Sequence, residues 1–155
     1  MVSALDFVLD IPEGSAVAKI RVVLADDHQQ MVAIVRQTLC EEFEIVGAVE
    51  DGKQAVNSVL TLNPDALVID ISMPILDGFQ AAKQLQTANC RTKVIFLSIY
   101  EGPDFLDAAF SAGASGYVSK ARLSTDLIPA IHEAMLGQIF ISGPLSMRRD
   151  TPALS

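Results

Sequence analysis

Four apolar stretches of the sequence end in polar residues that could do chemistry together. These residues are Asp26 and Asp27 after the first stretch, Asp70 at the end of the second, Ser98 at the end of the third and Lys120 after the fourth. Clustered carboxylates repel one another unless a cation joins them, and a small set of oxygen ligands suits Mg²⁺, which also takes phosphate oxygens as ligands. A carboxylate can accept a phosphoryl group and become an acyl phosphate. The residue types therefore predict metal-assisted phosphoryl transfer to a carboxylate.

Asp70 is the member of this set that is hardest to explain by structure alone. It follows four apolar residues, and a carboxylate at the end of a buried strand is costly unless it is paired or bound to a metal. Taken singly, Asp26 or Asp27 could cap a helix, Ser98 could simply end a strand, and Lys120 could lie at the surface. The hypothesis depends on the whole set, in which Lys120 neutralises the transferred group and Ser98 donates a hydrogen bond to it.

The spacing of apolar residues predicts the elements that bring this set together. Short Val- and Ile-rich runs, typical of strands buried on both faces, alternate five times with longer stretches of helical spacing. The predicted strands are Ile20–Ala25, Ile45–Val49, Ala66–Ile71, Lys93–Ile99 and Gly116–Ser119, and the predicted helices are Met31–Phe43, Ala55–Leu62, Phe79–Thr87, Pro103–Ala112 and Thr125–Leu136. This order predicts an α/β fold with a doubly wound parallel sheet. Ligands bind at the carboxyl ends of the strands in such sheets, where the polar set would meet.

The composition limits the classes of function. The chain has 155 residues, enough for one domain, and a net charge of −8, which provides no basic surface for phosphates. We therefore expect no direct binding of nucleic acid. No stretch is apolar for long enough to span a bilayer, and the first residues lack the basic start of a signal peptide. We expect no membrane association and a cytoplasmic location. Cys40 and Cys90 are expected to be two buried or half-buried thiols.

Four stretches that contain these residues resemble the response regulator receiver (CheY-like) family, in particular the branch usually joined to LuxR/NarL-type DNA-binding domains. The stretches are Val23–His28, Leu67–Gly78, Val94–Ser98 and Ala112–Lys120, and the similarity covers about Lys19 to Ile141. The resemblance implies a five-stranded, flavodoxin-like three-layer α/β/α sandwich with strand order 2-1-3-4-5. It also implies a receiver domain of a two-component phosphorelay.

The resemblance further implies a role for each residue of the site. Asp70 would be the phosphoacceptor; Asp26, Asp27, Asp70 and the backbone carbonyl of Ser72 would hold Mg²⁺; Lys120 would pair with the phosphoryl group; and Ser98 and Tyr117 would form the switch. A sensor histidine kinase would be the donor. The face formed by residues 103–112, 116–119 and 125–136 would change on phosphorylation, and it is a candidate homodimer interface.

Three features depart from the usual pattern of this branch. We expect a leader at residues 1–18, the receiver domain at 19–141 and a tail or truncated linker at 142–155. No helix-turn-helix follows the receiver. The chain is therefore expected to be either a stand-alone receiver or the receiver part of a LuxR/NarL-type transcriptional regulator. Finally, the bulky Ile99 and Tyr100 follow Ser98, and they could slow the loss of the phosphoryl group.

Three other functions share parts of this pattern. Haloacid-dehalogenase-like phosphatases also use an Asp at a strand end, but their general acid is an Asp two positions later, where this chain has Ser72. Flavodoxin-like cofactor binding needs a phosphate-binding loop after the first strand, where Asp26 and Asp27 would repel phosphate. A pure interaction module usually lacks a carboxylate or the lysine. We therefore expect no enzyme activity beyond self-directed phosphotransfer and autodephosphorylation.

Overall fold

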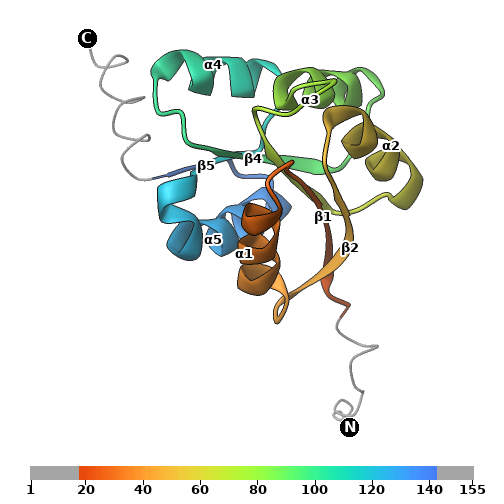
Figure 1. Ribbon diagram of the computed structural model, residues 1–155, viewed down its shortest axis with the longest axis vertical. Helices are drawn as coiled ribbons and strands as arrows, with labels where there is room; N and C mark the ends of the chain where they lie inside the picture. Colours follow the sequence, from red (N-terminus) through yellow and green to blue (C-terminus); the bar gives the residue numbers. More distant parts are fainter. Residues whose placement is uncertain (1–17, 143–155) are drawn as a thin grey trace, which may run out of the picture.

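The computed structural model describes residues 18–142 and contains a parallel six-stranded sheet between two layers of helices (Figure 1). The strand order is β2-β1-β3-β4-β5-β6. The expected leader and tail, apart from residues 18 and 142, lie outside the described residues. The elements are β1 (Ile20–Ala25), α1 (Gln29–Leu39), β2 (Phe43–Val49), α2 (Gly52–Leu62), β3 (Ala66–Asp70), α3 (Gly78–Thr87), β4 (Lys93–Ser98), α4 (Pro103–Ser111), β5 (Gly116–Ser119), α5 (Leu123–Met135) and β6 (Phe140–Ile141).

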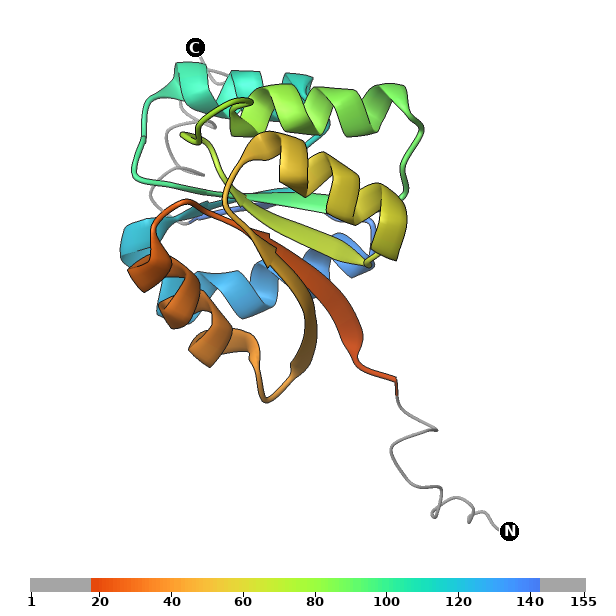
Figure 2. The same cartoon turned by 45° about the vertical axis from the view of Figure 1, so that its right-hand side comes forward.

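The helices divide between the two faces of the sheet as a doubly wound fold requires. Helices α2, α3 and α4 cover one face, and α1 and α5 cover the other (Figures 1 and 2). Side chains alternate between the faces along each strand. On β3, Leu67 and Ile69 belong to the core under α2, α3 and α4, whereas Ala66 and Val68 belong to the core above α1 and α5. All four are almost fully buried, which explains why this strand is apolar throughout.

The predicted fold class and the order 2-1-3-4-5 are confirmed, and two local differences have physical causes. Phe43 was predicted to end the first helix, but that helix ends at Leu39 and Phe43 begins β2. Phe43 lies four residues after Leu39 and packs in the same core layer, so its spacing looks helical. The short strand β6 pairs in parallel with β5, with Phe140 opposite Gly116. Two residues are too few to give a periodic signal.

Two helix starts are fixed by acidic side chains near the strand ends. Asp51 accepts a hydrogen bond from the backbone N–H of Gln54 at 2.8 Å and begins α2. Asp77 and Gln80 form a reciprocal capping box at the start of α3. Gly78 follows this cap, and a Cβ there would lie 2.4 Å from the carbonyl oxygen of Asp70. The missing side chain therefore lets α3 begin directly against the end of β3.

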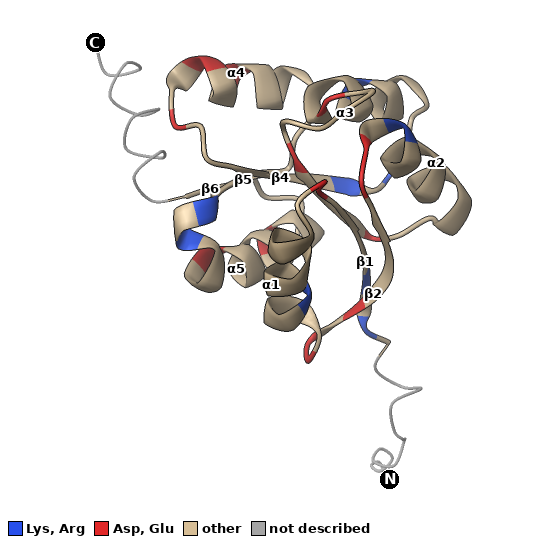
Figure 3. Ribbon diagram, viewed as in Figure 1, with Lys and Arg blue, Asp and Glu red and all other residues tan. Residues whose placement is uncertain are grey.

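The remaining expectations from composition concern the two cysteines, membrane-spanning segments and basic residues. Cys90 is half-buried as expected, but Cys40 is exposed, so the prediction for Cys40 was wrong. Cys40 is the C-cap residue of α1. None of the helices within residues 18–142 is both long and apolar enough to cross a membrane. Lys and Arg residues are distributed over the ends of several elements (Figure 3).

Candidate functional site

The neighbouring strands β1 and β3 bring acidic side chains together at their carboxyl ends. The two strands pair in parallel with Ala25 opposite Ile69, so Asp26 and Asp70 leave the sheet side by side. Both are 5% exposed. Together with the loop after β1 they form a cluster, hereafter the acidic cluster, whose ligand atoms all lie within 4.8 Å of one another: Asp26, Asp27, His28 and Asp70.

Lys120 contacts two of these carboxylates. It follows β5, which is separated from β3 by β4 in the sheet. It lies at the start of a short 3₁₀ turn, Lys120–Arg122, and its side chain is 12% exposed. Its Nζ lies 3.3 Å from Asp26 Oδ2 and 3.3 Å from Asp70 Oδ1. The lysine therefore holds Asp26 and Asp70 in place despite their like charges.

The electrostatics of Asp70 reflect three opposing influences. Burial is the largest and raises the pKa of Asp70 above its ordinary value. The Lys120 ammonium acts in the opposite direction, and the Asp26 carboxylate again raises the pKa. The net shift is upward. Burial thus makes the ionised form of Asp70 less favourable, and a neighbouring cation would favour that form.

The chemistry of the donor set fits a divalent cation. The carboxylates of Asp26, Asp27 and Asp70 carry three negative charges and Lys120 carries one positive charge, which leaves two negative charges at the cluster. Lys120 contacts Oδ2 of Asp26, while Oδ1 of Asp26 faces the side of Asp27 and His28. Carboxylate oxygens of this kind are the ligands that Mg²⁺ prefers.

His28 is a member of the cluster to which the sequence pattern assigned no role. Its Nδ1 lies 3.2 Å from Asp26 Oδ1 and 3.1 Å from Asp27 Oδ1. Its position directly after the two aspartates was the only signal in the sequence. That signal is weak, because a side chain next in sequence usually points elsewhere.

Ser98 and Tyr117 lie at adjacent strands and meet around the backbone of Tyr100. Both are fully buried. Ser98 Oγ accepts a hydrogen bond from the Tyr100 N–H at 2.8 Å, and the Tyr117 hydroxyl donates to the Tyr100 carbonyl at 2.8 Å. Burial raises the pKa of Tyr117, so its hydroxyl stays protonated as a donor. The structure thus groups these two side chains with the loop after β4.

Tyr100 also connects this loop to the loop after β3. Its hydroxyl lies 3.2 Å from Ser72 Oγ, and its ring stacks on Phe105 at a centroid distance of 4.4 Å. The sequence had indicated only that Tyr100 is bulky. Its contacts depend on the path of two loops, and periodicity says nothing about such paths. Through Tyr100, Ser72, which lies two residues after Asp70, is linked to the start of α4.

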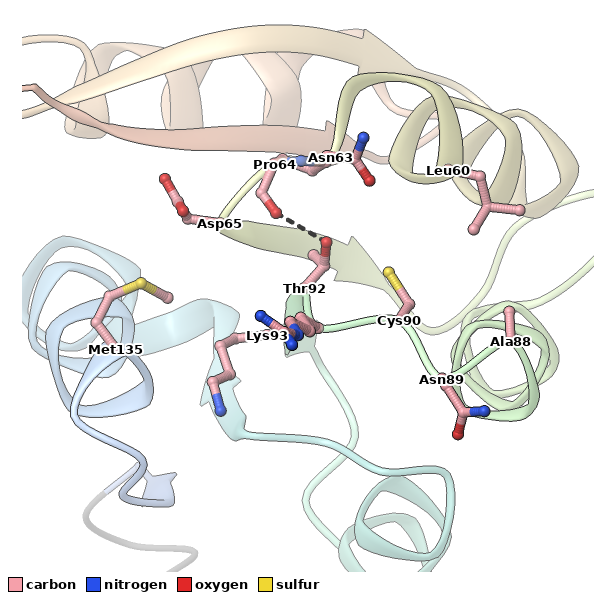
Figure 4. A pocket seen from close by; sticks show the side chains of 11 residues that line it. Leu60, Asn63, Pro64, Asp65, Ala88, Asn89, Cys90, Thr92, Lys93 and Met135 are labelled. Atoms are coloured by element: carbon pink, nitrogen blue, oxygen red, sulfur yellow. Dashed lines mark hydrogen bonds between the residues drawn. The ribbon is translucent and has the colours of Figure 1, made fainter.

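A hollow of about 530 Å³ lies at the opposite end of the strands from the acidic cluster, where β3 and β4 begin (Figure 4). Its lining includes Asn63, Asp65 and Cys90, and Thr92 Oγ1 donates to the Pro64 carbonyl at 2.8 Å. None of the residues of the acidic cluster contributes to it. In a doubly wound sheet, ligands bind at the carboxyl ends of the strands, so the acidic cluster is the better candidate site.

Comparison with known proteins agrees with this geometry. The family model for the response regulator receiver domain matches residues 22–132. The chain belongs to the response regulator receiver domain family. It is 36% identical over 125 residues to the transcriptional regulatory protein DegU of Brevibacillus brevis, a match that covers 79% of this chain and 53% of DegU. This receiver chain therefore spans about half the length of that relative.

Solved structures with the same fold belong to the same family. The signal receiver domain of the response regulator NarL from Mycobacterium tuberculosis has a TM-score of 0.76 and 28% identity, over 79% of this chain and all of that one. RcsB, solved as two dimers bound to two parallel DNAs, has a TM-score of 0.76 and 27% identity, over 84% of this chain and 67% of that one. The present chain is thus a receiver domain of the two-component response regulators, with relatives in the NarL/LuxR branch, and receiver domains are signalling domains.

Proposed function

We propose that Asp70 accepts a phosphoryl group from the phosphohistidine of a sensor histidine kinase. In this proposal Asp26, Asp27, Asp70 and the backbone carbonyl of Ser72 hold Mg²⁺. The observation that carries it is the position of Lys120, whose ammonium lies 3.3 Å from both Asp26 and Asp70 at the carboxyl edge of the sheet. A lysine with only a structural role would not be expected to contact two buried carboxylates at the ends of two different strands.

The chemistry is a transfer between two nucleophiles. A carboxylate oxygen of Asp70 forms the new O–P bond while the N–P bond of the phosphohistidine breaks, and the electron pair returns to the imidazole nitrogen of the kinase. Bound Mg²⁺ would supply positive charge to the phosphoryl oxygens. Lys120 adds a second positive charge from the protein itself. It also favours the ionised form of Asp70, which is the nucleophile, against the effects of burial and of Asp26.

Ser98 and Tyr117 form the proposed readout of the phosphorylated state. Their shared partner is the backbone of Tyr100, which links them to α4. A phosphoryl group on Asp70 adds charge and acceptor oxygens that attract the Ser98 hydroxyl. Movement of Ser98 would remove the acceptor of the Tyr100 N–H, so the loop and Tyr117 would rearrange together. The surface formed by α4, β5 and α5 is the proposed output face and a candidate dimer interface.

Phosphate incorporation tests the proposal directly. The protein is incubated with acetyl phosphate and Mg²⁺, and its intact mass is measured. We expect an alkali-labile gain of one phosphoryl group, which is abolished by EDTA and absent from Asp70→Asn. Equal gain in Asp70→Asn would show that another residue is modified, and absence of gain in the native protein would overturn the proposal.

The remaining parts of the proposal concern the chain as a whole. We place the receiver domain at residues 19–141, between a leader at 1–18 and a tail at 142–155, in the cytoplasm, where kinases make phosphohistidine from ATP. Its only catalysis would be phosphotransfer to itself and loss of that group. An alternative is that the chain is the receiver part of a LuxR/NarL-type DNA-binding regulator. The match to DegU, which covers 53% of that protein, favours this alternative.

A further inference from the structure

The hollow at the amino ends of β3 and β4 has the size and the lining of a binding site. Its volume of about 530 Å³ is within the range of about 300–1,000 Å³ that ligand pockets occupy. Leu60 and Met135 line it with apolar side chains, and Leu60 is 49% exposed. Cys90 contributes a half-buried thiol (Figure 4). Apolar walls of this kind favour an occupant with apolar side chains.

The charged side chains of the hollow favour an occupant that is also acidic. Arg91 and Lys93 line it, and neither forms an ion pair with another residue between 18 and 142. The carboxylate of Asp65 is the one negative charge of the lining, and it accepts a hydrogen bond from the backbone N–H of Arg21 at 2.8 Å. The lining therefore has a net charge of +1 in a chain whose net charge is −8. A positive region on an acidic protein attracts negative charge.

The leader, residues 1–18, has a composition that fits this hollow. It contains three acidic residues and no Lys or Arg. Within residues 5–11 every odd position is apolar, and Asp6 and Asp10 lie at even positions between them. Successive side chains of an extended chain point to opposite sides. An extended segment can therefore place its apolar side chains in the hollow and keep its carboxylates at the rim, where long basic side chains can reach them.

The leader also enters the sheet beside the hollow. The backbone N–H of Asp65 donates to the carbonyl of Arg21 in β1 at 2.9 Å, and Lys93 begins β4 on the other side of β3. Neighbouring strands are about 4.8 Å apart, so the hollow lies about 5–10 Å from the start of β1. The eight residues 12–19 can span about 26 Å at about 3.3 Å each. Pro12 and Gly14 in this connection favour the bend that the path needs.

We propose that residues 5–11 of the leader bind in this hollow of their own receiver domain. The apolar side chains at the odd positions pack against the apolar walls, and their removal from water drives the docking. The two aspartates pair with Arg91 and Lys93, which fixes the direction of the segment. This inference goes beyond the proposed function, because the hollow is at the opposite end of the strands from the acidic cluster and takes no part in phosphoryl transfer.

The reactivity of the two cysteines tests the proposal in the full chain. Cys90 lines the hollow and is the probe, whereas Cys40 is exposed at the end of α1 and is the internal control. Both are alkylated with N-ethylmaleimide, which is uncharged, and the rate at each thiol is followed by peptide mass. Replacing Phe7 and Leu9 together by Ser should accelerate Cys90 about tenfold, which corresponds to about 1.4 kcal/mol of docking. Cys40 should be unaffected, and Ala16→Ser, outside the segment, should change neither rate.

An exchange of charges tests the pairing that the proposal assigns. In the native chain, Asp6→Lys with Asp10→Lys should accelerate Cys90, because the leader then carries the same charge as the hollow. In a chain with Arg91→Glu and Lys93→Glu, the same two leader substitutions should slow Cys90, because opposite charges are restored. An effect of the same sign in both chains would overturn the assigned pairing.

The other occupants of the hollow give different results. An unchanged rate at Cys90 when Phe7 and Leu9 are replaced would overturn the proposal and leave the hollow to another ligand. A rate at Cys90 that falls as the concentration of the native protein rises would mean that the leader of a second copy binds there, and this would overturn docking within one chain. Neither result depends on phosphoryl uptake, so this proposal and the proposed function fail separately.

Discussion

The carboxylate of Asp70 is a case in which a functional group opposes the stability of the fold. Its pKa is raised in the folded chain, chiefly by burial, so the folded state holds this proton more tightly than the unfolded state does. The contribution of such a group is most favourable below the unfolded pKa of 3.8 and diminishes as the pH rises through the folded value. At neutral pH, without a metal, Asp70 therefore costs stability.

Replacing Asp70 by Asn should consequently stabilise the metal-free protein. We expect Asp70→Asn to raise the midpoint of thermal unfolding in EDTA at pH 7 by a few degrees, since about 1 kcal/mol corresponds to roughly 4–8 °C in small domains. Asp104→Asn, at the exposed start of α4, controls for the loss of one negative charge. A midpoint below that of the native chain would contradict this reading of Asp70.

The pKa of Asp126 is shifted in the opposite direction, at a site with no proposed function. Burial would raise its pKa, but hydrogen bonds from Arg122, Ser142 and Thr125 outweigh burial and lower the pKa. The Arg122 Nε donates to Asp126 Oδ2 at 2.9 Å. A lowered pKa gives stability that is present above the unfolded value of 3.8 and is lost as the pH falls through the folded value.

We therefore expect Asp126→Asn to destabilise the protein in a pH-dependent way. The loss should be about 1.5–3 kcal/mol at pH 7, the scale of hydrogen bonds to a charged group. It should shrink as the pH falls below the unfolded value of 3.8, where the carboxylate of the unfolded chain gains a proton, and it should be lost once the pH is below the lowered pKa of the folded chain. Urea unfolding of both proteins at pH 7 and pH 3 measures this, and a difference that stays constant with pH would rule out the charged hydrogen bonds as its cause.

Among the elements, the loop between β4 and α4 holds the contacts that connect the site to the rest of the domain. The Tyr117 hydroxyl donates to the Tyr100 carbonyl inside the fold, whereas the Tyr100 hydroxyl meets Ser72 at the surface. The two tyrosines offer a matched pair of substitutions. Tyr117→Phe should lower the free energy of unfolding by about 1–2 kcal/mol, because it removes a buried donor. Tyr100→Phe, which keeps the stack on Phe105, should cost less than half as much in the same urea titration. Equal costs would mean that burial does not decide the strength of these bonds.

The same loop provides a prediction about the lifetime of the phosphorylated state. Ile99 follows Ser98 and is 70% exposed, so its truncation removes little core packing. If its bulk limits the access of water to Asp70, Ile99→Ala should shorten the half-life of the acyl phosphate by a few fold. The decay is followed by intact mass after acetyl phosphate is removed. A half-life equal to or longer than that of the native chain would exclude this role for Ile99.

The elements also show what the sequence could predict and where it had to stop. Asp26, Asp70 and Lys120 were predicted to meet because parallel strands deliver their carboxyl ends to one edge, whatever the details of the loops. Phe43 was misplaced because helix and strand bury it in the same core layer. The contacts of His28 and Tyr100 depend on loop paths and side-chain rotamers, which the apolar pattern does not encode.

On the scale of the whole molecule, the last described residues close the far edge of the sheet. The backbone N–H groups of Phe140 and Ser142 donate to the carbonyls of Ser115 and Tyr117, and Ser142 Oγ accepts from the buried Ser119 N–H at 2.9 Å. Ser142 is itself fully buried. These bonds cover β5, which would be the edge strand without β6, and which also carries Tyr117 and precedes Lys120. The packed part of the described chain thus includes Ser142.

Shortening the chain measures how much this closure contributes. Two chains are compared, one that ends after Ser142 and one that ends after Gln138, so that they differ only by residues 139–142. The shorter chain loses two hydrogen bonds to β5 and one to Ser115 just before it, at about 1 kcal/mol each, together with the packing of Phe140. We expect its free energy of unfolding to be lower by about 3 kcal/mol or more in urea. Within the longer chain, Ser142→Ala should account for about 1–2 kcal/mol, because it leaves the Ser119 N–H buried without a partner. Equal stability of the two chains would place the end of the receiver domain at α5, and β6 would then be an addition that the fold does not need.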